Sequence, residues 1–158
     1  MKNLYIEPFN VMGITIKTDN TNQKCSKDIS ELWKKFINDN IIDQISNKID
    51  DSIYCIYTDY EGDYTNQYLV LLGCKVSSSD FIPDGLVVKK IGGGNYNMHI
   101  VKGNILQGIV LKQWKSIWNS NISRAYTCDF EVYNKDLNNH ENTIVKIFVA
   151  IKDHYIKP

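Results

Sequence analysis

Apolar residues recur at helical spacing in two stretches of the chain. The first stretch follows Ser26, which is predicted to cap a helix, with Asp28 and Glu31 in its first turn. Its apolar face consists of Ile29, Leu32, Trp33, Phe36, Ile37 and Ile41. A second face of this kind consists of Leu106, Val110, Trp114, Ile117 and Trp118. The pattern predicts two amphipathic helices, each packed on the rest of the protein by one side.

The other apolar segments have the alternation and the β-branched and aromatic content of strands. Segment 67–76 is apolar on both of its faces, which predicts a strand in the interior of a sheet. It pairs in a predicted hairpin with segment 53–58, and a second hairpin is predicted at the end of the chain. The predicted strands are residues 11–17, 53–58, 67–76, 86–91, 96–102, 125–133 and 144–152.

The stretch Ser77–Gly85 contains three consecutive serines and then Pro-Asp-Gly, which predicts a turn or linker near the middle of the chain. Each half around it has the order strand, helix, strand, strand. We therefore predict an α+β fold made of a tandem βαββ pseudo-repeat, residues about 1–78 and 84–158, within one domain of residues 1–158. Its antiparallel sheet would have both helices on one face and a ligand groove where the halves meet.

Composition narrows the choice of partners. The 158 residues include 43% hydrophobic residues, 18 basic and 18 acidic residues, as in a globular protein with no net charge. Neutrality disfavours long-range attraction to nucleic acid or to an anionic membrane. The N-terminal segment lacks the compact apolar run of a signal peptide or membrane span, so a cytoplasmic location is expected.

Several kinds of reactive site are not predicted. The four cysteines are scattered without a histidine at metal-ligand spacing, so we expect reduced thiols and neither a metal nor another cofactor. The glycines at 92–94 lack the residues that complete a phosphate loop and predict a turn instead. No serine lies in a nucleophile-elbow pattern.

Sequence segments from both halves resemble the GyrI-like family, the effector-binding domains of AraC-type regulators. In the second half these are KKIGGGNYNMHIVKG, LKQWKSIW, RAYTCDFEVY and VKIFVAIK, and in the first half VMGITIKT, DISELWKKF, IYCIYTDYEGD and YLVLLGCKV. The resemblance implies a bacterial domain that binds lipophilic, often cationic small molecules. Many members carry a DNA-binding helix-turn-helix region, whereas here the first predicted strand begins within about ten residues, so we expect a stand-alone member with no DNA-binding domain.

The resemblance places Glu131 at the bottom of the ligand groove, facing a bound cation. Alternation along segment 125–133 puts Thr127, Asp129, Glu131 and Tyr133 on one face, and the opposite face is predicted to be the core face. Without the resemblance, a solvated surface glutamate is the expected role. A carboxylate among aromatic rings is poorly solvated, so an empty pocket is expected to raise its pKa and an arriving cation to stabilise it.

Aromatic residues supply the candidate walls of this groove. Trp33 and Trp114 lie on apolar helix faces, which favours simple packing, whereas Trp118 and Tyr133 are favoured as walls because of their closeness to Glu131. The full set of candidates is Trp33, Tyr57, Tyr68, Tyr96, Trp114, Trp118 and Tyr133. The segment NSNISRAY departs from the commoner family pattern, and its Arg124, the only arginine, is expected either to support this loop or to line it.

Three functions are compatible with this sequence. The first is capture of a lipophilic or cationic small molecule without turnover. The second is hydrolysis of toxic electrophiles with Glu131 in acid/base catalysis, as a few related proteins are reported to do. The third is inhibition of a protein partner, as in the gyrase inhibition that gave the family its name. A homodimer is compatible with each of them.

Overall fold

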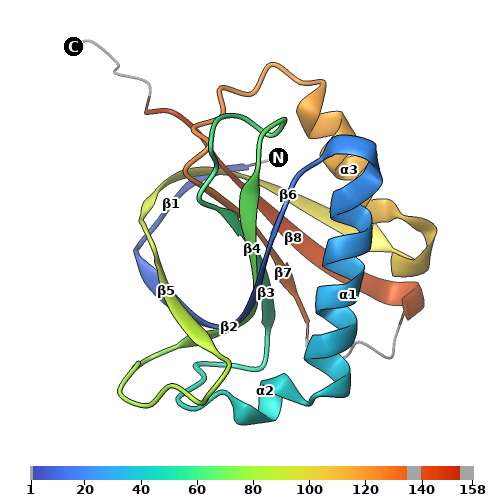
Figure 1. Ribbon diagram of the computed structural model, residues 1–158. Helices are drawn as coiled ribbons and strands as arrows, with labels where there is room; N and C mark the ends of the chain where they lie inside the picture. Colours follow the sequence, from blue (N-terminus) through green and yellow to red (C-terminus); the bar gives the residue numbers. More distant parts are fainter. Residues whose placement is uncertain (1, 135–139, 154–158) are drawn as a thin grey trace.

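The computed structural model describes residues 2–134 and 140–153. Its strands form one antiparallel sheet in the order β1-β6-β8-β7-β3-β4-β2-β5 (Figure 1). The strands are β1 Lys2–Ile6, β2 Phe9–Thr18, β3 Ile53–Thr58, β4 Tyr68–Val76, β5 Val87–Ile91, β6 Gly94–Gly103, β7 Cys128–Tyr133 and β8 Thr143–Ala150. The helices are α1 Lys24–Asn38, α2 Ile41–Gln44 and α3 Ile109–Trp118, and the 3-10 turns are η1 Thr21–Gln23, η2 Ile105–Gln107 and η3 His140–Asn142.

The strand order is symmetric about the pair formed by β3 and β7. Outward from this pair, the sheet runs β3-β4-β2 in one direction and β7-β8-β6 in the other. Helix α1 connects β2 to β3 and helix α3 connects β6 to β7, so each triplet of strands has its own helix. The predicted α+β class is confirmed, with an antiparallel sheet that carries α1 and α3 on one face. The seam between the halves is the β3–β7 pair.

Two short links curl the sheet toward a barrel. Edge strand β1 is joined to β2, near the other edge, through Glu7 and Pro8 alone. In the same way, edge strand β5 is joined to β6 through Gly92 and Gly93 alone. Links of two residues can span only a short distance, so the two edges of the sheet must approach each other. Figure 1 shows this curl on the side away from α1 and α3.

The curled sheet has a hydrophobic core on each face. The helix-side core contains Leu32 and Phe36 of α1 and Trp114 of α3. The inner core lies within the curl and contains, among others, Phe130 and Phe148, whose rings stack 4.6 Å apart. The prediction of a single core face for segment 125–133 was therefore incomplete, because the face that carries Glu131 is covered by the helices.

Several boundaries differ from the predicted ones, and two of the differences have local conformational causes. Helix α1 begins at Lys24, before the predicted cap Ser26, because Gln23 adopts a left-handed conformation with φ 60° that starts the helix there. Strand β7 begins only at Cys128, because Tyr126 has φ 55° and interrupts the extended chain. Strand β1 and the short helix α2 were not predicted. Their short stretches carry too few apolar positions to define a period.

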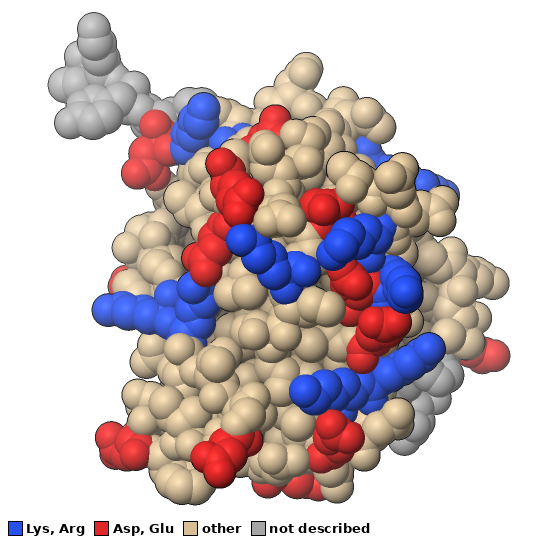
Figure 2. Space-filling model, viewed as in Figure 1, with Lys and Arg blue, Asp and Glu red and all other residues tan. Residues whose placement is uncertain are grey.

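The outer surface carries charges of both signs. Figure 2 shows basic and acidic side chains interspersed on the face that includes α1. Exposed ion pairs such as Lys17 with Glu61, at 2.9 Å, contribute to this mixture. None of the helices in the described part of the chain is long and apolar enough to span a membrane.

The close approach of the paired strands β2 and β4 depends on two facing glycines and gives a testable prediction. Gly13 and Gly73 are opposite each other, and a Cβ at Gly73 would lie 2.0 Å from the carbonyl oxygen of Met12. The atoms nearest to this Cβ belong to the backbone of Met12 and Gly13, and they cannot rotate away as a side chain could. We expect Gly73→Ala to lower the free energy of unfolding, measured in urea, by about 3 kcal/mol, the upper part of the usual range for overpacking.

Gly92→Ala is the matched control. Nothing lies within 4 Å of a Cβ at Gly92, so this variant should stay within about 0.5 kcal/mol of the wild type. Equal losses in the two variants would contradict the role given to the close approach of β2 and β4.

Candidate functional site

A cavity of about 720 Å³ lies on the helix-covered face of the sheet, at the seam between the halves. Helix α1 contributes Trp33, α3 contributes Trp114, and Tyr57 and Glu131 come from the seam strands β3 and β7. Among the described residues that line it there is no Lys, Arg or His. The lining residues are Asn20, Cys25, Ser26, Ile29, Ser30, Trp33, Tyr57, Tyr60, Tyr64, Tyr68, Ile105, Leu106, Gly108, Val110, Leu111, Trp114, Glu131 and Tyr133.

Glu131 is the acidic residue of this cavity and is only 2% exposed. Its Oε1 accepts hydrogen bonds from the Tyr57 hydroxyl and the Trp114 indole N–H, both at 2.8 Å. Its Oε2 accepts a hydrogen bond from the Tyr133 hydroxyl at 2.7 Å. The three donors come from three different elements, so the carboxyl group ties β3, α3 and β7 together. All three donors are electrically neutral.

Burial raises the pKa of Glu131 above its ordinary value, although the hydrogen bonds from Tyr133, Trp114 and Tyr57 oppose this effect. The pKa values of Tyr57 and Tyr133 are themselves raised well above the ordinary value, by burial first and then by nearby acidic groups. Both hydroxyls therefore keep their protons at neutral pH and remain donors. The neutral donors therefore offset only part of the cost of burying the ionised form of Glu131.

Aromatic rings pack around this group mainly edge to face. The Trp33 and Tyr133 rings are 4.9 Å apart at 77°, and the Tyr57 and Trp114 rings are 5.6 Å apart at 74°. The Tyr57 ring also lies 6.0 Å from the Tyr68 ring. Such contacts fix the ring orientations that present the hydroxyl and indole donors to Glu131.

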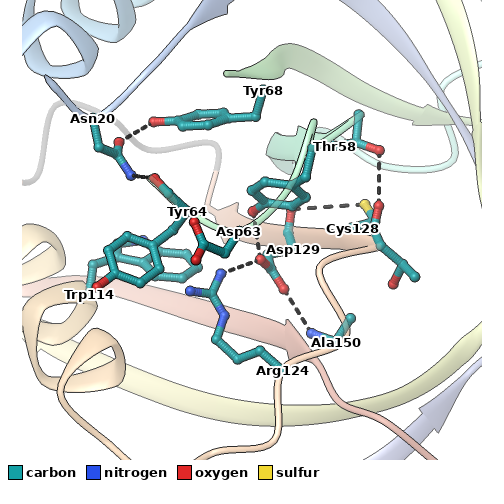
Figure 3. A network of polar contacts seen from close by, with 12 residues as sticks. Asn20, Thr58, Asp63, Tyr64, Tyr68, Trp114, Arg124, Cys128, Asp129 and Ala150 are labelled. Atoms are coloured by element: carbon teal, nitrogen blue, oxygen red, sulfur yellow. Dashed lines mark hydrogen bonds and ion pairs between the residues drawn. The ribbon is translucent and has the colours of Figure 1, made fainter. Parts of the chain in front are cut away.

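A second buried acid, Asp129, lies beside the cavity and has a different environment. It is fully buried, and its Oδ2 accepts hydrogen bonds from Arg124 Nη2 at 2.7 Å and the Tyr60 hydroxyl at 2.6 Å. Its Oδ1 accepts one from the Ala150 amide at 2.8 Å. Figure 3 shows the Arg124 guanidinium reaching Asp129 beside Trp114. The sequence left the role of Arg124 open, and this ion pair supports the loop from within.

The connection between β3 and β4 forms part of the cavity wall through Tyr60 and Tyr64. Asn20 donates to the Tyr64 carbonyl at 2.6 Å and accepts from the Tyr68 hydroxyl at 2.5 Å (Figure 3). The Tyr64 ring stacks on Trp118, with centroids 5.5 Å apart and planes within 5°. These contacts hold the connection against the rest of the wall.

The structure brings together most of the candidate residues. Trp33, Tyr57, Tyr68, Trp114, Glu131 and Tyr133 all line the cavity. Trp114 packs in the helix-side core, as expected, and its indole N–H also hydrogen-bonds Glu131.

Two candidates lie elsewhere. Tyr96 belongs to the inner core on the opposite face of the sheet, where its ring packs 5.3 Å from Phe130. Trp118 does not line the cavity, because its ring lies against Tyr64, which does. Sequence reasoning missed Tyr60, Tyr64 and Asn20 as wall residues. The tyrosines in the segment DYEGDY were the available sign, since aromatic rings are unusual in a purely solvated hairpin loop.

Comparison with known proteins identifies related chains of the same fold. The model of the Cass2 family, described as integron-associated effector-binding proteins, matches residues 4–151. An integron cassette protein from the mobile metagenome of Vibrio cholerae is 28% identical, with a TM-score of 0.75 that covers 96% of this chain and 95% of the other. The resemblance to GyrI-like effector-binding domains is thereby confirmed.

Two further proteins are similar to this chain, one in sequence and one in fold. YobU of Bacillus subtilis (strain 168), which is named as a candidate transcriptional regulator, is 27% identical over 124 residues, or 77% of this chain and 76% of its own. The protein SAV2435, solved with bound tetraphenylphosphonium, shares the fold with a TM-score of 0.79 and 14% identity, over 96% of this chain and 93% of the other.

The raised pKa of Glu131 gives a prediction for the ligand-free protein. Below the ordinary pKa, Glu131 is protonated in both the folded and the unfolded states. As pH rises from there through the higher folded-state pKa, the unfolded state ionises first and the folded state loses stability. We expect the free energy of unfolding of the wild type to fall over this window relative to Glu131→Gln, measured in urea at stepped pH.

The Gln variant keeps the shape of the side chain and cannot ionise, so the difference between the two proteins isolates this group. A difference that rises with pH would show that the folded protein stabilises the ionised carboxylate, against the effect of burial.

Proposed function

The chain belongs to the Cass2 family of integron-associated effector-binding proteins, and we propose that its effector is a lipophilic cation whose charge is balanced by Glu131. The observation that carries the proposal is a carboxyl group, 2% exposed, that receives hydrogen bonds only from neutral donors within the described residues. A cation in the cavity would supply the missing opposite charge. It would also shift Glu131 to its ionised form.

The energetics of this site favour a cation over a neutral ligand. Ionising a buried carboxyl group without a counter-charge is costly, and this is why burial raises its pKa. A ligand cation replaces the lost solvation, so part of the binding free energy arises only for a positively charged ligand. Binding should therefore strengthen as pH rises through the pKa of Glu131 and should release a proton where the free protein is protonated.

The walls favour a lipophilic ligand of no single shape. The cavity of about 720 Å³ lies within the usual range for small-molecule sites. Trp33, Tyr64 and Tyr68 present rings to it, and each ring near a desolvated cation contributes about 0.5 to 2 kcal/mol. Such contacts need no directed hydrogen bond from the ligand. Several aromatic cations of different outline would then fit.

Tetraphenylphosphonium is a suitable test ligand, since SAV2435, a protein of the same fold, is solved with it. Its anionic counterpart tetraphenylborate has the same four phenyl rings and the opposite charge, so the two separate charge from shape. We expect tetraphenylphosphonium, at about a hundred times its Kd, to raise the stability of the wild type by about 2.7 kcal/mol and tetraphenylborate to have no such effect. Thermal unfolding measures both.

The matched variants are Glu131→Gln and Glu7→Gln. Both replace one carboxyl group by an uncharged amide, but Glu7 is exposed outside the cavity. The cation effect should disappear in Glu131→Gln and persist in Glu7→Gln. Equal stabilisation by the two probes, or an undiminished cation effect in Glu131→Gln, would refute the proposal.

A further inference from the structure

The two buried acids of β7 differ in how their charges are balanced. Asp129 and Glu131 are two residues apart on one strand, so their side chains leave the same face of the sheet. Asp129 has an ion pair with Arg124, whereas Glu131 has only neutral donors. Among the described residues, a cation thus pairs with Asp129 and none pairs with Glu131.

The surroundings of the Arg124 guanidinium are those of an aromatic cation site. Its Cζ lies 4.4 Å from the ring centroid of Tyr126, 5.8 Å from that of Trp114 and 5.9 Å from that of Tyr64. Trp114 and Tyr64 also line the cavity. The guanidinium therefore occupies an aromatic and acidic position directly beside the cavity, separated from it by shared rings (Figure 3).

The backbone around Arg124 holds it in this position. Arg124 forms an isolated bridge with Ile151, and the Ala125 amide donates to the Ala150 carbonyl at 2.8 Å. Tyr126 then adopts φ 55°, an unfavourable conformation for a residue with a large side chain, and its ring lies over the guanidinium. The side chain of Arg124 is only 5% exposed. It cannot leave Asp129 without breaking this packing.

We infer that Arg124 determines the charge specificity of the cavity: by filling the second acidic position, it restricts the site to ligands with one positive charge. A second positive group near Asp129 meets a fixed guanidinium and finds no free carboxylate. This inference rests on the proposed function, because it concerns the same cavity and the same class of ligand.

Ethidium and propidium are a matched pair of probes. They share one aromatic cationic ring system, and propidium carries a second quaternary ammonium group on a short chain. We expect the wild type to bind ethidium at least about tenfold more tightly than propidium, because the second charge has no partner and is repelled by Arg124. Dye fluorescence at fixed pH and ionic strength gives both Kd values.

Variants at Arg124 and Asp129 separate the added charge from the added size. Arg124→Met removes the guanidinium and leaves Asp129 free, so the ratio of the two Kd values should shift toward propidium by about tenfold or more. Arg124→Met/Asp129→Asn has the same space without the acid. It should lose most of the shift toward propidium and keep only the smaller part that comes from removing the guanidinium. Arg124→Lys keeps the positive charge and should retain the wild-type preference.

Arg124→Met leaves a buried carboxylate without its partner and can fail to fold. In that case the double variant, which has neither charge, carries the test. Its preference for ethidium should be smaller than that of the wild type because the repelling guanidinium is gone.

The outcomes separate this inference from the proposed function. If ethidium binds and its binding depends on Glu131, but the ethidium-to-propidium ratio is the same in the wild type and every folded Arg124 variant, the inference is overturned and the proposed function stands. If the wild type binds ethidium no better than Glu131→Gln does, the proposed function itself fails.

Discussion

The desolvation of one carboxyl group, that of Glu131, constrains the arrangement of the whole cavity. A group this deeply buried must either stay neutral or receive compensating dipoles and charge. The fold supplies the dipoles from both halves, with Tyr57 on β3 and with Trp114 and Tyr133 from α3 and β7. One carboxyl group therefore depends on several parts of the fold. These are the strands of the seam, helix α3 and the rings that orient the donors.

The neighbouring acid shows the other physical solution to the same problem. Asp129 is as deeply buried and also accepts three hydrogen bonds, but one of its donors, Arg124, is charged, while Tyr60 and the Ala150 amide are neutral. Because Tyr60 also lines the cavity, the two acids share a wall. The acid that has an ion pair thus lies next to the acid that has only neutral donors among the described residues.

The spacing of apolar residues predicted which residues share a face of a strand or helix. It did not predict which of these faces line the cavity, because that depends on how the helices cover the sheet. Strand alternation placed Glu131 and Tyr133 on one face, and helical spacing placed Trp33 and Trp114 on apolar faces, all correctly. Periodicity does not distinguish a packed face from a cavity wall, since an indole can do both at once. Tyr96 was misplaced because both faces of the sheet are buried, and nothing in its alternation indicates which face the helices cover.

The two-residue links that curl the sheet affect which residues can be substituted without loss of the fold. They enclose an inner core that includes Phe130 and Phe148 and that, among the described residues, shares none with the cavity wall. Substitutions in the wall can alter ligand choice while this core continues to hold the strands together. The architecture separates the part that maintains the fold from the part that can change the choice of ligand.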